Sequence, residues 1–219
     1  MNLLPAEIQK WFYQVLTEEI SPGEFEQWLY ANRELEKYIP AEDYLELIAL
    51  NYKENSDKYA LWRLLKKQID LSDFETYKML ALLRQAQQKN DRLAEILAAF
   101  YHLYCRGYEF LQDLGLGMGL SIEDPVIDGS NTASWQSLSP DEQSKFLESL
   151  SPLLEECLSD LIMQLEKKKI VLTGRLDHND NYIYKDFRSE AEKRSKYWIP
   201  VSNENAANPT FGKQRGGRR

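Results

Sequence analysis

The stretch Asp91–Asp113 reads DRLAEILAAFYHLYCRGYEFLQD and is the most hydrophobic of the helical patterns in this chain of 219 residues. Asp91 is suited to cap a helix N-terminus, because its carboxylate accepts hydrogen bonds from the first backbone N–H groups. The apolar pattern then predicts one long, buried helix that ends near Asp113. The chain is therefore predicted to be mainly helical.

Before this stretch, the chain reads as a run of short amphipathic helices joined by loops of two to seven residues. Short loops make neighbouring helices antiparallel. The first helix repeats its apolar residues at helical spacing, at Ile8, Trp11, Phe12, Val15 and Leu16. The predicted helices cover residues 5–19, 21–32, 40–50, 58–69 and 72–89, and on the third of them Tyr44, Leu45, Leu47 and Ile48 are predicted to face inward.

Three predicted helices begin with a Ser that is followed three residues later by Glu. In such a capping box the Ser oxygen accepts a bond from the N–H of the third residue, and the Glu carboxylate accepts one from the Ser N–H. Proline at the first helical position supports two of these starts, since its missing N–H costs nothing there. The three pairs are Ser21 with Glu24, Ser72 with Glu75, and Ser139 with Glu142.

After the long helix the sequence changes character. Leu114–Leu120 reads LGLGMGL, which we interpret as a helix C-terminal glycine followed by a flexible turn. Residues 121–137 are loop-like, and helices resume beyond them. The elements predicted there are helices at 139–150 and 152–168 and a β-hairpin formed by KIVLTG (169–174) and YIYKDF (182–187) around a loop that contains DHNDN.

The length allows one large domain or two small ones. We predict a mainly α fold, in which residues 1–200 form a single multi-helix antiparallel bundle-like domain with a small C-terminal β-hairpin. A sub-boundary near residues 114–138 is the alternative division. Residues 201–219 are predicted to be a flexible basic tail, because this end is polar and rich in Pro, Asn and Gly.

The charge is unevenly distributed along the chain. The net charge is −8, but the last seven residues contain Lys213, Arg215, Arg218 and Arg219, which leaves about −12 for residues 1–212. Such an acidic body repels nucleic acid and attracts basic partners. Nucleic acid or a membrane surface could be contacted through the basic tail, although such a Gly/Arg end is more often simply a solvated, disordered terminus.

Several classes of protein are excluded by what the sequence lacks. No apolar run approaches the ~18–20 residues of a membrane span, and the start MNLLPAEIQKWFYQVL has neither the basic residues nor the cleavage site of a signal peptide. Cys105 and Cys157 are isolated, so we interpret both as buried thiols of a protein in the reducing cytoplasm.

No combination of residues resembles a catalytic or metal-binding set. Gly115, Gly117 and Gly119 follow a helix and not a strand, unlike a dinucleotide fingerprint. His102 and Cys105 share one face of the long helix, where a core histidine beside a core thiol is the simpler interpretation. The run Asp177–Asp180 lacks the calcium-binding pattern and suits a hairpin loop. We therefore predict no enzyme, no cofactor and no metal.

Carboxylates and tyrosines alternate around the second and third helices. They suit a protein interface, because a tyrosine ring buries area while its hydroxyl stays hydrogen-bonded. Solvated helix faces are the plainer interpretation. The predicted partner-binding residues are Glu24, Glu26, Tyr30, Glu34, Glu42, Asp43 and Glu46.

The segment Ser21–Lys53 resembles the N-terminal segment of small bacterial proteins of the toxin-immunity type, which are encoded beside polymorphic toxins. The shared features are Glu24-Phe25-Glu26 with Trp28 and Tyr30, then Leu35-Glu36, Asp43-Tyr44, Leu47-Ile48 and Asn51-Tyr52, with Gly107-Tyr108, Phe110-Leu111 and Leu114-Gly115 further on. This resemblance implies a cytosolic inhibitor that binds one cognate toxin and has no catalytic residues.

We therefore expect a non-enzymatic protein-binding protein, with a basic toxin domain as its partner and an acidic, Tyr-rich surface that occludes it. Two alternatives stay open. The chain could be an adaptor or regulatory module that uses the loop Gly115–Ser137 and the tail, or a small enzyme that uses His102, Cys105 or nearby acids. Solvent exposure of Cys105 would favour the enzyme.

Overall fold

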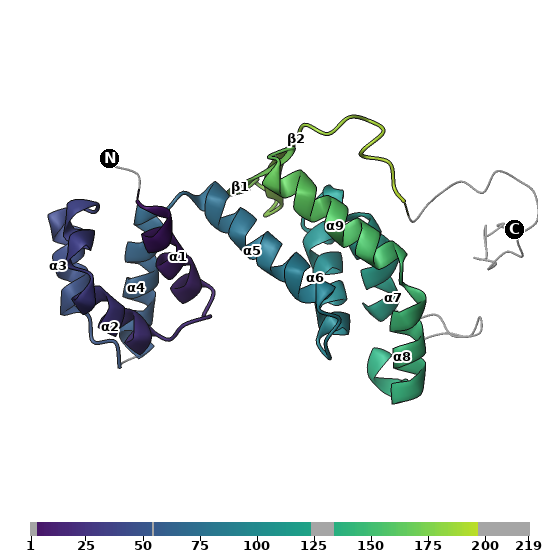
Figure 1. Ribbon diagram of the computed structural model, residues 1–219, viewed down its shortest axis with the longest axis horizontal. Helices are drawn as coiled ribbons and strands as arrows, with labels where there is room; N and C mark the ends of the chain where they lie inside the picture. Colours follow the sequence, from purple (N-terminus) through teal and green to yellow (C-terminus); the bar gives the residue numbers. More distant parts are fainter. Residues whose placement is uncertain (1–3, 54, 124–133, 197–219) are drawn as a thin grey trace, which may run out of the picture.

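The computed structural model describes residues 4–53, 55–123 and 134–196 and shows a mainly helical protein with a C-terminal β-hairpin (Figure 1). The predicted fold class is thereby confirmed, whereas the predicted basic tail lies outside the described residues. None of the described helices is long and apolar enough to cross a membrane. The elements are α1 (Ala6–Leu16), α2 (Pro22–Ala31), α3 (Ala41–Ala49), α4 (Asn55–Gln68), α5 (Leu71–Gln87), α6 (Leu93–Cys105), α7 (Leu120–Glu123), α8 (Pro140–Ser149), α9 (Leu153–Glu166), β1 (Ile170–Leu176) and β2 (Tyr182–Asp186).

The buried apolar side chains form two separate clusters, which correspond to the two lobes of the ribbon in Figure 1. The first cluster belongs to α1–α4 and reaches Leu65, and the second begins at Met79 and belongs to α5–α9 with β1. The clusters therefore part at the junction of α4 and α5. The residues near 114–138, where a sub-boundary was the alternative, do not separate them, because Leu114 and Met118 are buried inside the second cluster.

Two of the three predicted capping boxes are present. Ser21 and Ser139 each accept a hydrogen bond from the backbone of the Glu three residues later, and that Glu accepts one from the Ser backbone. The predicted box at Ser72 is wrong, because α5 begins at Leu71 and Asp70 caps it by accepting from the backbone N–H groups of Ser72 and Asp73.

The hydroxyl of Ser72 instead bonds the hairpin. It donates to the carbonyl oxygen of Leu172 on β1, a hundred residues later in the chain. Beside this contact, β1 bulges between Leu172 and Arg175, and Gly174 has a φ of +66°. A Cβ at Gly174 would lie 2.6 Å from the Cβ of Leu71, so only glycine allows the strand to approach the start of α5 this closely.

The long helix predicted to reach Asp113 ends eight residues earlier, at Cys105. Gly107 follows with a φ of +102°, the left-handed conformation in which helices commonly terminate on glycine. The chain reversal is held by the hairpin, since the backbone N–H of Tyr182 donates to the carbonyl of Arg106 at 2.7 Å. Short 3-10 helices cover Arg33–Lys37, Glu109–Leu111 and Trp135–Ser137.

The glycine-rich run predicted as a flexible turn is a π-helix, Asp113–Gly119, that packs against α6. The N–H of Gly117 donates to the carbonyl of Gln112 five residues earlier, at 2.9 Å. A Cβ added to Gly119 would lie 2.2 Å from the carbonyl oxygen of Leu97, and one at Gly115 would lie 2.7 Å from that of Phe100. The glycines thus serve backbone contact between two helices, not flexibility.

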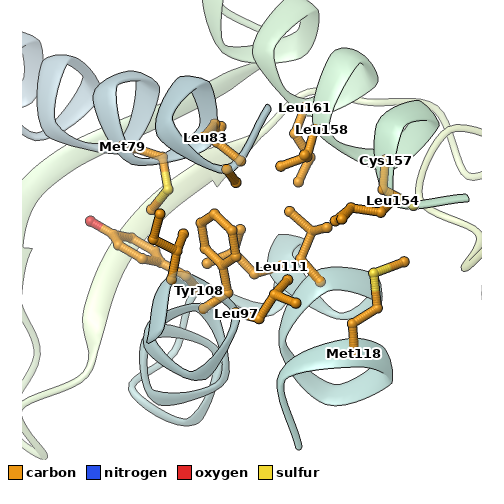
Figure 2. Packing of buried hydrophobic residues seen from close by; sticks show 14 of the residues in the cluster. Met79, Leu83, Leu97, Tyr108, Leu111, Met118, Leu154, Cys157, Leu158 and Leu161 are labelled. Carbon is orange, nitrogen blue, oxygen red and sulfur yellow. The ribbon is translucent and has the colours of Figure 1, made fainter. Parts of the chain in front are cut away.

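The second cluster is built around this contact. Figure 2 shows Leu97 from α6, Leu111 and Met118 facing Leu83 of α5, with Leu154, Leu158 and Leu161 of α9 closing the cluster. Leu83, Leu97 and Leu111 are fully buried. Because buried side chains in a core are closely packed, the spacing between α6 and the π-helix constrains the position of the elements packed around them.

Gly119→Ala is expected to lower the free energy of unfolding by about 3 kcal/mol, the upper part of the usual cost of overpacking, because a carbonyl oxygen cannot move aside without breaking α6. Gly23→Ala is the matched control, since a Cβ there meets nothing within 4 Å. It should leave stability unchanged or raise it by up to ~1 kcal/mol. Urea unfolding followed by circular dichroism measures both. Equal stability of the two variants would contradict the close helix contact.

Candidate functional site

Helix α3 presents one face to the core and the opposite face to solvent. At 100° per residue, Tyr44 and Leu47 point into the first cluster, and both are buried. Leu45 lies on the other side and is 65% exposed. The inward position predicted for Leu45 is therefore wrong. Its place on the helix wheel, beside Glu42 and at least 100° away from Tyr44 and Leu47, is the signal in the sequence that indicated exposure.

Charged side chains hold α3 against α4. Lys67 Nζ donates to Asp43 Oδ1 at 2.7 Å, and Gln68 Nε2 donates to Asp43 Oδ2 at 2.6 Å. One turn further along α3, Glu46 pairs with Arg63. The pairs join later residues of α3 to earlier residues of α4, so the two helices run antiparallel. Continued along the helices, this pairing brings Tyr59 toward the C-terminal end of α3.

Two tyrosines cover the carbonyl groups at that end of α3. The Tyr52 hydroxyl donates to the carbonyl of Leu47 at 2.7 Å, and the Tyr30 hydroxyl donates to that of Ile48 at 3.4 Å. These carbonyls belong to the last turn, where the helix supplies few partners, and the Leu47 carbonyl accepts only a long bond from the Leu50 N–H at 3.4 Å besides that of Tyr52. Burial raises the pKa of Tyr52, and the charges of Tyr30 and Glu26 raise it further.

The predicted carboxylates have different positions and partners. Glu24 forms the capping box of α2, where hydrogen bonds from the Ser21 backbone and side chain lower its pKa. Glu34 pairs with Lys37 on an exposed turn. Asp43 is 3% exposed, so its carboxylate is committed to α4 and is not part of the surface. Glu42 is exposed, and among the described residues no ion pair with it is found.

The structure thus brings together only some of the predicted partner-binding residues. Leu45 is an exposed apolar side chain that directly precedes Glu46 and lies one helical turn after Glu42. Exposed tyrosines also lie on the two neighbouring helices, Tyr30 of α2 at 52% and Tyr59 of α4 at 77%. Neither Leu45 nor Tyr59 was predicted to belong to the surface. We call the α3 face the group Tyr30, Glu42, Leu45, Glu46, Ala49 and Tyr59.

Two expectations about the thiols and histidines are wrong. Cys105 is exposed, as is His102, because α6 turns that side away from the second cluster. This exposure counts in favour of the small-enzyme alternative. His102 Nε2 lies 3.2 Å from Glu123 Oε1. Cys157, in contrast, is buried as predicted, and burial, with Asp113 next, raises the pKa of its thiol to about 12.

The remaining candidate for metal binding is a hairpin loop. Asp177 accepts hydrogen bonds from the backbone N–H groups of Asn179 and Asn181 at 2.8 and 2.9 Å, which is the turn chemistry expected of such a residue. Within residues 4–53, 55–123 and 134–196, no group of three or more His, Cys, Asp or Glu side chains is placed to hold a metal ion.

Comparison with models of known protein families, with curated protein sequences and with solved structures found no match to this chain. The α3 face is therefore judged on its own geometry.

Asp43→Asn is expected to lower the free energy of unfolding by about 1.5–3 kcal/mol at pH 7, the usual contribution of a hydrogen bond to a charged group. Glu34→Gln is the control, because an exposed ion pair contributes only ~0.2–1 kcal/mol. Urea unfolding at pH 7 measures the difference. If both variants are equally stable, Asp43 does not anchor α3 to α4.

The same carboxyl predicts a pH dependence. The hydrogen bond from Lys67 is the main cause that holds the pKa of Asp43 below its ordinary value of 3.8. The unfolded chain therefore takes up this proton first as the pH falls. The stabilisation is complete above about pH 4 and is lost as the pH drops through the lower, folded pKa. The stability difference between wild type and Asp43→Asn should shrink over that range.

One thiol per chain is expected to react with 5,5′-dithiobis(2-nitrobenzoate) in the native protein, and a second only after unfolding. Cys105 is exposed, whereas Cys157 is buried and its raised pKa leaves little of the reactive thiolate. The absorbance of the released thiolate counts the groups. Cys105→Ser should remove the fast reaction, and a fast reaction that survives would contradict the exposure of Cys105.

Proposed function

We propose that this chain is a non-enzymatic, cytoplasmic protein-binding protein, and that it inhibits a toxin in the manner of an immunity protein by covering a basic site on it. The α3 face makes the contact. The proposal rests on the likeness of Ser21–Lys53 to immunity-type proteins and on one structural observation, the exposure of Leu45 on the same side of α3 as Glu42.

An apolar side chain in this position is suited to anchor a partner. Interface energy concentrates in a few central residues that fill pockets, with tyrosine among the most frequent, while the charged rim governs specificity and rate. Leu45 would be the anchor, and the exposed rings of Tyr30 and Tyr59 would add apolar area from the neighbouring helices. Because α4 and the tyrosines already hold α3 in place, little ordering would be required on binding.

The charge of the region favours a basic partner. Between Ser21 and Leu50 the sequence contains seven acidic residues and two basic ones. Asp43 neutralises Lys67, and Glu46 of the face neutralises Arg63. Glu42 is left to face the partner. Complementary charge of this kind accelerates encounter and weakens as salt screens it.

The test begins with co-purification of the tagged chain with the products of its neighbouring genes. A stoichiometric complex with a basic toxin domain, whose activity the chain suppresses, is the expected result. Recovery of the chain without such a domain, or with a toxin that stays active in the complex, would contradict the proposal.

Variants of the face then test its location. Leu45→Glu should weaken binding about thirtyfold or more, the effect of losing a central anchor, and Glu42→Lys should slow association, because it reverses the charge opposite a basic site. Calorimetry and stopped-flow mixing measure these effects. Asp43 is left unchanged, since its loss would disturb the fold.

Glu7→Lys is the matched control for Glu42→Lys. Glu7 lies in the first turn of α1 as Glu42 lies in the first turn of α3, so both substitutions lose the same favourable interaction with a helix dipole. Only the change at Glu42 should affect binding. Wild-type affinity in folded Leu45→Glu would show that the contact lies elsewhere.

A further inference from the structure

A cleft of about 430 Å³ opens between the two lobes. The end of α1 and one side of α4 form one wall, and α5 with Leu103, Tyr108 and Tyr182 forms the other. This volume is in the range of sites for small molecules. The cleft and the α3 face share no residue, so a site here goes beyond the proposed function.

Tyr108, at the base of the cleft, has a hydroxyl without a partner. The side chain is 1% exposed, and within the described part of the chain its oxygen accepts or donates no hydrogen bond. Figure 2 shows that the hydroxyl points away from the leucines of the second cluster, on the side of Met79, which also lines the cleft. A buried hydroxyl normally has a partner, so this one is available to a polar atom brought by a ligand.

A change in the side-chain rotamer of Met79 would open the hydroxyl of Tyr108 to the cleft. The unbranched thioether side chain of Met79 lies beside the ring of Tyr108 and can change rotamer without moving the helix. Burial raises the pKa of Tyr108, and the negative charge of Glu75, which also lines the cleft, raises it further. The hydroxyl is thus neutral and able to donate at any physiological pH.

The walls are aromatic and the rim is charged. Trp62 lines the cleft from α4, and Phe74 and Tyr182 line it from the opposite side. At the rim, Glu19 accepts from the Tyr77 hydroxyl and Glu75 accepts from Lys78, so both carboxylates are occupied. Lys66, in the last turn of α4, is exposed and has no ion pair with any residue that the structure describes.

We propose that this cleft binds a small aromatic acid with a second polar group at the end of the ring opposite its acid. The ring lies between Trp62 and Phe74, the carboxylate pairs with Lys66, and the distal polar group bonds the hydroxyl of Tyr108. Flat rings stack on aromatic walls of this kind, and the two polar contacts fix the direction in which the ligand enters.

The test compares two probes, 4-hydroxycinnamate and cinnamate, which differ only in the distal hydroxyl. Isothermal titration calorimetry with the full chain should show one saturable site that prefers 4-hydroxycinnamate by about tenfold, the effect of one hydrogen bond. Tyr108→Phe should remove this preference and leave the affinity for cinnamate unchanged. Lys66→Gln should weaken both probes about three- to fivefold, whereas Lys167→Gln, at the corresponding end of α9, should weaken neither.

Two further measurements test whether the probes bind in the cleft and whether the Tyr108 hydroxyl lacks a partner. Ala81→Phe fills the cleft with a side chain and should abolish binding of both probes in a protein that melts normally. Tyr108→Phe without ligand should melt at the wild-type temperature or above it, because it removes an unpartnered buried group.

The site is overturned if neither probe saturates, if Ala81→Phe binds as the wild type does, or if Tyr108→Phe retains the preference. A clear fall in the melting temperature of Tyr108→Phe would show that the hydroxyl has a partner within the fold, and would also overturn it. Leu45→Glu, which tests the partner surface, should bind both probes normally, so the two proposals fail independently.

Discussion

The contact of Tyr13 with Phe74 and Tyr77 determines how the two lobes lie together. The ring of Tyr13, on α1, lies 5.4 Å from that of Phe74 and 5.2 Å from that of Tyr77, both on α5. The Tyr77 hydroxyl then donates to Glu19 at 2.8 Å. Tyr13 and Phe74 are buried but belong to neither cluster, so they form a small aromatic joint between two independent cores. The cleft opens beside this joint and shares Phe74 with it.

The helices of the two lobes are held in place by different kinds of contact. In the second lobe, glycines let a π-helix touch the backbone of α6, and the leucines of α5 and α9 pack around that contact. In the first lobe, Asp43 draws α4 against α3, and tyrosine hydroxyls cover the end of α3. Asp43, which the sequence does not distinguish from the neighbouring carboxylates, thus has a structural role. The proposed α3 face consists of side chains that α3 and its neighbours leave exposed to solvent.

Both proposed sites rest on groups that the fold leaves unsatisfied. Leu45 stays in water on a helix that has an apolar core available on its other side, and the Tyr108 hydroxyl is removed from water without gaining a partner. Neither arrangement improves stability, since burial would favour the leucine and a phenylalanine would suit the position of Tyr108. Such groups are where a binding partner can supply what the chain lacks, and they lie on different lobes.

The sequence by itself determined the features that depend on neighbouring residues: the helical class, the C-terminal hairpin, the capping boxes at Ser21 and Ser139, and the burial of Cys157. Local hydrogen bonds and apolar periodicity decide these features. Only the tertiary structure decided the division into two cores, the end of α6 at Cys105, the packing of Gly119 and the burial of Asp43. Ser72 bonds Leu172 instead of capping its own helix, and Asp43 meets Lys67 across two helices. These outcomes depend on partners brought close by packing, and no local pattern in the chain specifies which distant residue will be there.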